Sequence, residues 1–425
     1  MKQTGIGLIA AIATIGAALA AGAGAIQDQS EDGRFLRVVE TRGESIALEV
    51  AARRYAKADG TGPEVCLVSV AHIGDPALYI TLQSLLDQFD VVLYESVKPP
   101  GAGRPSGDDD SERTESTRES LGFIAGLIVN HVETKGACPV TLADLVETLA
   151  NDDPRLSTWA NLASEDAWGT PIEYAPAADS FTLRSLGADG RAGGDGQNAD
   201  IVITDRDAPA ALALSGDDGL QAQLADALGL AFQLEAVDYG REHFRCSDMT
   251  VDQLERELTA RGIDFGGLSG TLAGTSFSAQ LVNVLLKVVK TLDAFFEGRV
   301  SDMAKLMMIE VLGNESLTEA ALNQQFGAGF AEVIVGERNQ IVMDDLSALI
   351  AAEPEVKSVA IFYGAAHMAD FDQRLADQMD YHATTAEWIP AMTLNLEESA
   401  LSAMEIAQMR LMLRQAVRQM MRQGN

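Results

Sequence analysis

The chain has 425 residues, with 63 acidic against 31 basic side chains and a formal net charge of −32 at pH 7. This length favours about two to three domains, and the negative charge argues against a nucleic-acid partner, whose phosphates would be repelled. The acidic residues are spread along the chain, with one tight run at 108–110, and we interpret them as solvated surface.

The first 25 residues have the layout of a secretory signal peptide. Lys2 supplies the positive charge, residues 5–20 are apolar, and the small residues 21–25 form an A-x-A-like cleavage site. We therefore expect an exported protein, periplasmic or extracellular. The alternative is an uncleaved N-terminal segment that anchors the chain to a membrane, although the apolar run is short for a span of about 20 residues.

Five segments after this leader are assigned from composition and spacing. Residues 33–57 are predicted as a polar lead-in and a helix. Residues 98–114 are rich in Pro, Gly, Asp and Ser, which bury too little apolar surface to fold, so they predict a disordered linker. Helices are predicted over 121–132 and 141–149, followed by a Gly- and Asp-rich stretch of short strands and loops.

A β-α-β unit lies between the first helix and the linker. The apolar run 65–71 predicts a strand that leads into His72, and the run 91–94 predicts a strand that leads into Glu95. Between them the residues 75–86 predict a helix, because they begin with an Asp-Pro pair suited to the N-cap and first helical position. The spacing of the two strands fits a parallel crossover.

A second such unit is predicted near the C-terminus. The apolar run 333–335 is interpreted as a strand that leads into Glu337, and the run 359–363 as a strand that leads into Gly364 and His367. The two units predict a single sheet. Ligands of open α/β sheets gather at the carboxyl ends of the strands, so the candidate site is expected where these polar residues follow the strands.

The rest of the second half is predicted to be largely helical, including residues 281–312 and 397–422. Residues 270–276 read as a flexible loop near the site. The last helix carries a basic stripe at i,i+4 spacing, formed by Arg410, Arg414, Arg418 and Arg422. We interpret the stripe as a solvated face that complements the helix C-terminus; a surface for membrane or an acidic partner is the alternative.

Residues 118–204 resemble the major pseudopilin of type II secretion, protein G. The resemblance is carried by the helix over 121–132 and by the segments CPVTLADL (138–145), WGTPIEY (168–174), SLGADG (185–190) and GGDGQNADI (193–201). Pseudopilins begin with a Gly and an apolar helix with Glu at its fifth position, which this chain lacks after Gly5. We therefore expect a stabilising or docking module in mid-chain, not a pilus subunit.

The resemblance implies that the Gly- and Asp-rich loop of this module binds Ca²⁺. The ligands carried over are Asp189, Asp195 and Asp200, with the carbonyl oxygen of Leu186 as a further candidate. Carboxylate and carbonyl oxygens are the ligands that Ca²⁺ prefers, and the glycines let the backbone fold around an ion. The alternative is a turn held by hydrogen bonds alone.

The flanking segments 36–100 and 208–395 resemble the TraB/PrgY/GumN family, which includes the TIKI proteases. The motifs are SVAH (69–72), VLYE (92–95), GERN (336–339) and GAAH (364–367), supported by LGLAFQ (228–233). Ser69 stands where the family has the first Gly of a G-x-x-H motif. The resemblance implies an α/β domain, a mixed sheet with flanking helices, and metal-dependent hydrolysis.

The residue types agree with this chemistry. Two imidazoles and a carboxylate form a mixed N/O site suited to Zn, Mn or Co, with a place left for water. We assign His72, Glu95 and His367 as ligands, Glu337 as ligand or general base, and Arg338 as stabiliser of an oxyanion. Asn339 could orient either of its neighbours. Ser69, Gly364 and His243 are candidates to line the cleft.

We thus predict an exported α/β protein interrupted by a small α+β pseudopilin-like domain. The predicted parts are a signal peptide or anchor (1–25), the first part of the TraB-like domain (26–100), the linker (101–114), the pseudopilin-like domain (115–206), the second TraB-like part (207–395) and a C-terminal amphipathic helix (396–425). The predicted function is metal-dependent hydrolysis of a peptide or protein substrate. The alternative is a non-enzymatic envelope protein that binds a peptide or cofactor and docks to secretion components through the module.

Overall fold

The computed structural model describes residues 34–107, 109–177, 180–208, 230–262, 299–313 and 332–423. The predicted signal segment, the loop 270–276 and residues 281–298 of the predicted helix lie outside these ranges. Among the described helices, none is long and apolar enough to cross a membrane.

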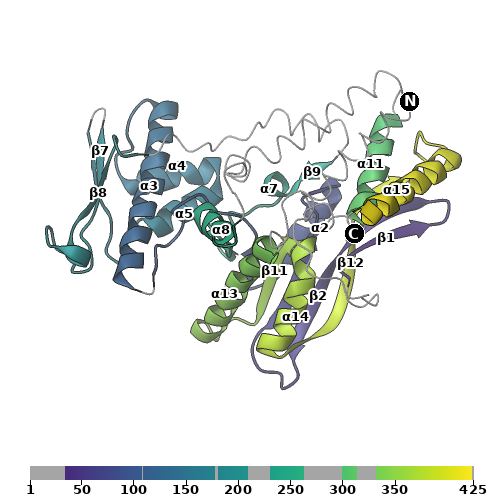
Figure 1. The fold of residues 1–425 in the computed structure, drawn as a ribbon, viewed down its shortest axis with the longest axis horizontal. Coiled ribbons are helices and arrows are strands. Elements are labelled where there is room, and N and C mark those ends of the chain that lie inside the picture. The colour runs from purple at the N-terminus through teal and green to yellow at the C-terminus, as the bar shows by residue number, and fades with distance from the viewer. Residues whose placement is uncertain are drawn as a thin grey trace.

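A seven-stranded mixed sheet forms the centre of the α/β domain (Figure 1). Its strand order is β1-β2-β3-β11-β5-β10, with β12 paired to the other side of β2. Strands β3, β11, β5 and β10 are parallel, whereas β1, β2 and β12 pair antiparallel. The strands are β1 (Leu36–Thr41), β2 (Ser45–Lys57), β3 (Glu64–Val70), β5 (Val91–Tyr94), β10 (Phe244–Cys246), β11 (Ser358–Gly364) and β12 (Tyr381–Asn395).

Helices cover both faces of this sheet. Helices α2 (Pro76–Leu86) and α11 (Arg299–Leu312) pack on one face, and α13 (Arg338–Ala352) and α14 (Met368–Met379) pack on the other. Strands β3 and β11 are therefore buried on both sides, which explains their continuous apolar sequences. The predicted α/β class, a mixed sheet with flanking helices, is confirmed.

The predicted β-α-β unit is confirmed, with one addition. Strands β3 and β5 are parallel and joined by α2, but β11 lies between them and pairs with both. Asp75 is the N-cap of α2 and Pro76 follows it, as predicted, although the Asp75 side chain makes no capping hydrogen bond. It accepts instead from the Thr393 N–H, at 2.8 Å, and pairs with Lys305.

Two predicted elements are wrong. Residues 36–57 form the hairpin β1–β2 and not a helix. Both faces of β2 are largely buried, so its sequence lacks the two-residue alternation by which a strand is predicted. Residues 333–335 lie in a helix and not in a strand: a π-helical segment, η3 (Glu332–Glu337), runs directly into α13. Packing of η3 against α8 overrides the strand preference of β-branched residues.

The predicted linker is ordered in its described part. Helix α3 (Asp110–Lys135) begins inside it, and the Asp109 side chain caps the helix by accepting from the N–H groups of Ser111 and Glu112. Ala102 packs into the core of the following domain. One capped turn and one buried methyl group thus order a stretch whose average composition predicts disorder.

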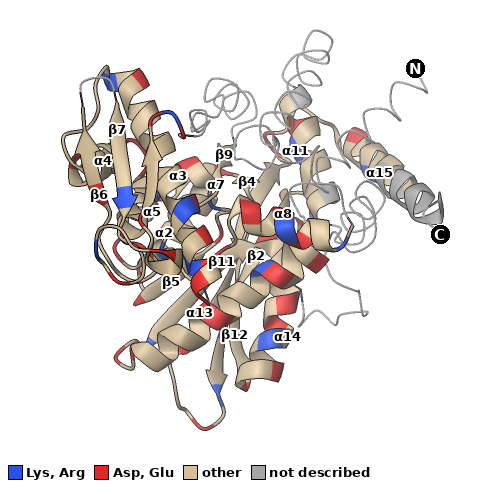
Figure 2. Cartoon of the chain, turned by 60° about the vertical axis from the view of Figure 1, so that its left-hand side comes forward, with Lys and Arg blue, Asp and Glu red and all other residues tan. Residues whose placement is uncertain are grey.

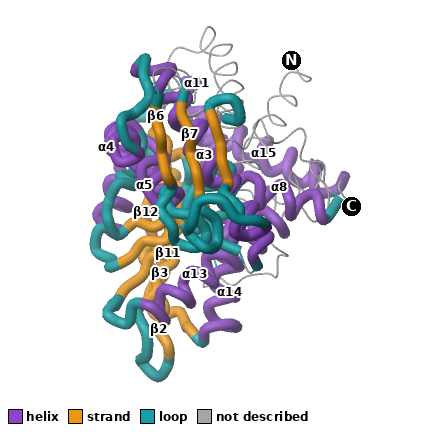
Figure 3. The backbone as a smooth tube through the Cα atoms, turned by 90° about the vertical axis from the view of Figure 1, so that its left-hand side faces the viewer, coloured by secondary structure: helices purple, strands orange, loops and turns teal. Residues whose placement is uncertain are grey.

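The insertion has its own core and its own sheet (Figure 3). Helix α3 packs with α4 (Leu142–Asp152) and α5 (Pro154–Ala163) against the antiparallel strands β6 (Glu173–Pro176), β7 (Phe181–Ser185) and β8 (Ile201–Thr204). A short 3-10 turn, η2 (Gly196–Asn198), lies between β7 and β8. The two predicted helices and the strand-and-loop end are confirmed.

Smaller elements complete the described chain. They are β4 (Ile73–Gly74), which pairs with β9 (Ala231–Phe232), the helices α7 (Gln233–Ala236), α8 (Val251–Ala260) and α15 (Ala403–Gln423), and the 3-10 turn η4 (Ala365–His367). On α15, Arg410 pairs with Glu310 and Glu40, so the first member of the predicted basic stripe is an ion-paired residue. Acidic positions are spread over many elements, as predicted for solvated surface (Figure 2).

Candidate functional site

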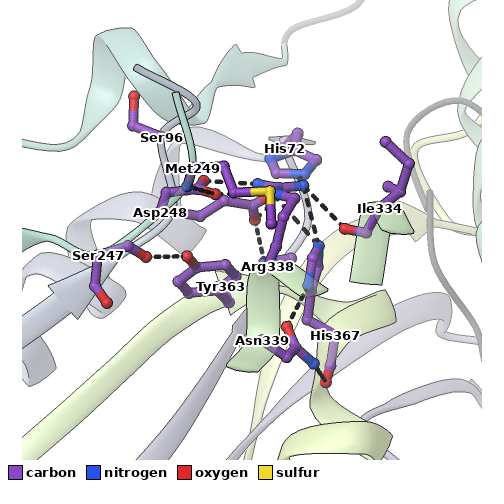
Figure 4. Close-up of polar contacts among 12 residues, drawn as sticks. His72, Ser96, Ser247, Asp248, Met249, Ile334, Arg338, Asn339, Tyr363 and His367 are labelled. Atoms are coloured by element: carbon purple, nitrogen blue, oxygen red, sulfur yellow. Dashed lines mark hydrogen bonds and ion pairs between the residues drawn. The ribbon is translucent and has the colours of Figure 1, made fainter. Parts of the chain in front are cut away.

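The carboxyl ends of the parallel strands meet at one edge of the sheet. Phe362 of β11 is in register with Val68 of β3 and Tyr94 of β5, and Cys246 of β10 is also in register with Tyr94. The residues that follow these strands therefore converge. They include His72, Glu95, Asp248 and His367. Arg338 reaches Asp248 and His367 from the start of α13 (Figure 4).

Glu95 lies at the centre of this cluster. Its Oε1 accepts from Arg338 at 2.7 Å, and its Oε2 accepts from the Gly364 backbone N–H at 2.7 Å. The Nε2 atoms of His367 and His72 lie 3.5 and 4.0 Å from Oε1 and Oε2. Burial alone raises the pKa of Glu95, but Arg338 and then the two imidazoles outweigh it and hold this pKa well below its ordinary value. The carboxylate is therefore ionised at neutral pH.

Arg338 joins Glu95 to a second carboxylate. Its Nε and a terminal nitrogen donate to the two oxygens of Asp248, at 2.9 and 2.7 Å. Burial lowers the pKa of Arg338, but Asp248 and Glu95 outweigh this and raise it above its ordinary value. One guanidinium against two carboxylates leaves the cluster with one net negative charge. Arg338 is thus fully engaged in this structure and does not point at an empty oxyanion position.

Amide side chains hold both imidazoles in the same way. The Nδ1 of His72 lies 2.6 Å from Gln233 Oε1, and the Nδ1 of His367 lies 2.6 Å from Asn339 Oδ1. An amide oxygen only accepts, so each Nδ1 carries the hydrogen and a neutral ring has its lone pair on Nε2. The Nε2 of His367 accepts from a terminal nitrogen of Arg338 at 3.4 Å. Burial lowers the pKa of His367 to about 3, so this ring is neutral at pH 7.

The exposure of the two rings differs. The His367 side chain is 3% exposed and the Glu95 side chain 12%, whereas the His72 side chain is 34% exposed. His72 is therefore the side from which solvent or a ligand reaches the cluster.

Three of the predicted site residues lie elsewhere. The Glu337 side chain pairs with Arg261 of α8. His243 precedes β10, at the amino end of the strand, and so lies away from the edge that carries Glu95. Ser69 is buried beside Tyr363 in the sheet, and its hydroxyl has no partner among the described residues.

Sequence reasoning missed Asp248, Gln233 and Tyr239 as parts of the cluster. Asp248 also follows a parallel strand, but β10 has only three residues, Phe-Arg-Cys, and no apolar run marks it. Gln233 donates to the Tyr239 hydroxyl at 3.0 Å while it accepts from His72. No local pattern predicts this pairing, because His72 and Gln233 are far apart along the chain.

The residue types of the cluster are those that bind divalent transition metals, but their spacing in this structure does not form a metal site. Two imidazole Nε2 atoms and one ionised carboxylate are suitable ligands, and the net negative charge favours a cation. A Cβ built at Gly364 would lie 3.0 Å from His72 Nε2 and 3.2 Å from Glu95 Oε2, so the missing side chain leaves room between two donors. In the described part of the chain, however, no three His, Cys, Asp or Glu side chains lie close enough together to hold a metal ion.

The predicted calcium loop is folded by its own hydrogen bonds. Gly187 has a positive φ, and a Cβ there would meet the carbonyl oxygens of Gln197 and Ala199 at 2.8 and 2.9 Å. Asp200 accepts from the Gly193 N–H at 3.0 Å and lies 3.5 Å from Arg184. Asp189 accepts from the Arg191 N–H at 3.1 Å. The glycines allow the backbone of the loop to pack closely, and the carboxylates of Asp189 and Asp200 accept from backbone N–H groups. The Ca²⁺ ligands Leu186, Asp189, Asp195 and Asp200 stay a prediction.

Comparison with known proteins identifies the insertion. Residues 131–204 match the family described as Type II secretion system (T2SS), protein G. The Type II secretion system core protein G of Xanthomonas campestris pv. campestris is 32% identical over 114 residues, which are 26% of this chain and 80% of that protein. No solved structure matches the chain. The TraB-like resemblance of the α/β domain stays a prediction.

Proposed function

The chain belongs to the type II secretion protein G family through residues 131–204, and from this premise we propose an exported envelope protein in which a pseudopilin-like docking module interrupts a metal-dependent hydrolase domain. The substrate class we propose is a peptide or protein, following the TraB/TIKI resemblance of the α/β domain. The module is proposed to dock to secretion components and to bind Ca²⁺ through its Gly- and Asp-rich loop.

One observation carries the hydrolase proposal: two imidazole Nε2 atoms face the same ionised carboxylate in a cluster with net negative charge. His72, Glu95 and His367 would hold Zn, Mn or Co after their side chains move closer together than they are in this structure. Such an ion supplies an activated water near neutral pH. Asn339 and Gln233 hold the imidazoles from behind, which is the usual arrangement around metal-binding histidines.

The remaining predicted roles require local rearrangement. Arg338 donates to Glu95 and Asp248, so it would have to release one of these carboxylates before it contacts a substrate oxygen. Glu337, the predicted general base, would have to release Arg261 before it takes a proton. Its side chain is 35% exposed, so this movement meets little packing resistance.

Metal stoichiometry tests the proposal. Elemental analysis of the dialysed full chain is expected to give about one transition metal per chain, which His367→Ala removes. His382→Ala is the matched control, because His382 is an exposed histidine whose side chain bonds to Asp380 and lies outside the cluster. If neither the wild-type protein nor the control holds metal after reconstitution with Zn, Mn and Co, the hydrolase proposal fails.

A second candidate function is a non-enzymatic envelope protein that binds a peptide or cofactor. The engagement of Arg338 by two carboxylates and of Glu337 by Arg261 favours it, because both proposed catalytic groups are occupied. Turnover of peptide libraries that is lost in Glu337→Gln, without loss of folding, would support the hydrolase. Metal binding without turnover in the wild-type protein would support the binding protein.

A further inference from the structure

A buried glutamine connects His72 to a tyrosine. Gln233 is 2% exposed, accepts from His72 Nδ1 through Oε1 at 2.6 Å, and donates through Nε2 to the Tyr239 hydroxyl at 3.0 Å. Its backbone N–H also donates to the His72 carbonyl oxygen at 3.0 Å. Both ends of the amide are therefore satisfied, and two hydrogen bonds join Gln233 to the residue that it orients.

We propose that Gln233 and Tyr239 are positioning residues that fix the ring orientation and tautomer of His72; the metal affinity part of this inference rests on the function proposed above. The Nδ1–H of His72 points to the amide oxygen, which leaves Nε2 for a ligand. Because the His72 side chain is one-third exposed, packing alone does not hold its ring. The amide does so, and Tyr239 holds the amide.

The other imidazole supplies an internal comparison. Asn339 accepts from His367 at the same distance, 2.6 Å, and its nitrogen donates to the His367 carbonyl oxygen and to Asp370. Gln233 thus accepts the Nδ1 hydrogen of the more exposed ring, His72, as Asn339 accepts that of the buried ring, His367. Asn339 follows Arg338 directly in the sequence, whereas Gln233 comes from the segment after the insertion.

Tyr239 also contacts the strand that carries Glu95. Its ring centroid lies 4.8 Å from that of Tyr94, the residue before Glu95, and 6.1 Å from that of Phe244. The residue is buried, and the backbone N–H of the preceding Asp238 donates to Gln83 of α2 at 2.8 Å. Two aromatic rings therefore hold the ring of Tyr239, and the bond from Asp238 to α2 holds the backbone beside it.

The insertion reaches the same tyrosine. Arg155 of α5 lies 5.9 Å from the Tyr239 ring, and Asp153 holds this guanidinium with bonds of 3.0 and 2.8 Å. Pro154 lies against Gly240, where a Cβ would meet it at 3.1 Å. A continuous series of contacts thus runs from the pseudopilin-like module through Tyr239 and Gln233 to His72.

The test uses three variants of the full chain. Gln233→Met keeps the size of the side chain but removes the acceptor, whereas Gln233→Glu keeps an acceptor. Tyr239→Phe removes the hydroxyl that holds the amide. Nitrogen-15 NMR of the metal-free protein reads the His72 tautomer, and competition with a chelator reads Zn²⁺ affinity. Gln233→Met is expected to lose the preference for the Nδ1–H tautomer and to bind Zn²⁺ about 10–100-fold more weakly. Gln233→Glu is expected to keep both, and Tyr239→Phe to lie between them.

Two outcomes would overturn the inference. One is a folded Gln233→Met or Tyr239→Phe protein with the wild-type tautomer and affinity. The other is a Gln233→Glu protein as impaired as Gln233→Met, since the loss would then reflect packing and not the acceptor. If the wild-type protein binds no Zn²⁺ while the tautomer still depends on Gln233, the positioning role stands and only the metal function fails.

Discussion

Gly364 donates its backbone N–H to Glu95 Oε2 over 2.7 Å, so the last residue of β11 fixes the carboxylate that follows β5. The same glycine leaves the space between Glu95 and His72 free, because it has no Cβ. Its φ of −53° is open to any residue, so close approach and not backbone conformation requires glycine here. His367 lies three residues further on, at the end of the 3-10 turn that follows Gly364. The position of β11 therefore sets the positions of both Gly364 and His367.

Gly364→Ala is expected to disturb the cluster. The new methyl group would press on His72 Nε2 and Glu95 Oε2, so Zn²⁺ binding should weaken and unfolding should become easier by about 1–3 kcal/mol, as for overpacked sites. Gly122→Ala, in the middle of α3 with no atom within 4 Å of its Cβ, is the control and should be neutral or stabilising. Urea denaturation and chelator competition measure both; unchanged Zn²⁺ affinity in Gly364→Ala would contradict the prediction.

Asp248→Asn is expected to be strongly destabilising. It removes one of the two carboxylates that balance the buried Arg338, and breaking a buried pair of this kind costs about 3–5 kcal/mol. The comparison is Asp238→Asn, which breaks an exposed pair with Arg241 and should cost no more than about 1 kcal/mol. Thermal denaturation of the two variants decides the point, and equal melting temperatures would show that Arg338 does not depend on Asp248.

The parallel strands and their carboxyl-end residues could be predicted from sequence because β3, β5 and β11 are apolar runs of strand length. Their order could not, since nothing local indicates that β11 lies between β3 and β5. Residues 45–57 were misassigned because a strand buried on both faces loses its alternation. Residues 333–335 were misassigned because three apolar residues read alike in a buried strand and in a buried helical turn.

The candidate site divides in the same way. His72, Glu95 and His367 follow apolar runs, which makes them predictable from sequence, and the structure brings them together. Glu337 is predicted as a site residue because residues 333–335 resemble a strand that ends beside it. These residues form a π-helical segment instead, and Glu337 pairs with Arg261. Gln233 and Asp248 act through contacts between segments far apart in the chain, which only the fold reveals.

Acid is expected to destabilise the metal-free protein through His367. The pKa of this ring is lowered to about 3, below the value of about 6.5 for an unfolded histidine. Between these pH values the unfolded chain binds a proton that the folded chain does not, so stability falls as pH falls through this window and is unaffected above it. From pH 7 to pH 5 the expected loss is about 2 kcal/mol.

The measurement is urea denaturation with a chelator at both pH values, in the wild-type protein and in His367→Leu. The variant should lose about 2 kcal/mol less than the wild-type protein over this interval, whereas the exposed-histidine control His382→Asn should behave like the wild-type protein. Glu95 also makes the folded protein less stable in acid, but only at lower pH. Its folded-state pKa is lowered, so this stability is lost as pH falls below the ordinary carboxyl pKa. Equal pH dependence in wild-type and His367→Leu proteins would refute the assignment.

Calcium is expected to raise the melting temperature of the pseudopilin-like module. The ion would compete with Arg184, which lies 3.5 Å from Asp200, so Arg184→Gln should enlarge the shift and Asp200→Asn should abolish it. Glu173→Gln, which removes the other carboxylate partner of Arg184, is the control for loss of the ion pair itself. Calorimetry with Ca²⁺ and after chelation measures the shift, and its absence in the wild-type protein and in Arg184→Gln would exclude the calcium site.

Arg155→Ala is expected to weaken Zn²⁺ binding although Arg155 belongs to the insertion. It removes the cation beside the Tyr239 ring, a contact of about 0.5–1 kcal/mol, and so should lower affinity about 2–5-fold. If the effect passes through Gln233, it should vanish in the Gln233→Met background, as a double-mutant cycle would show. Arg118→Ala, an exposed arginine that pairs with Glu115 in its own helix, should leave affinity unchanged. An equal loss from Arg155→Ala in both backgrounds would mean that the insertion does not act on His72 through this glutamine.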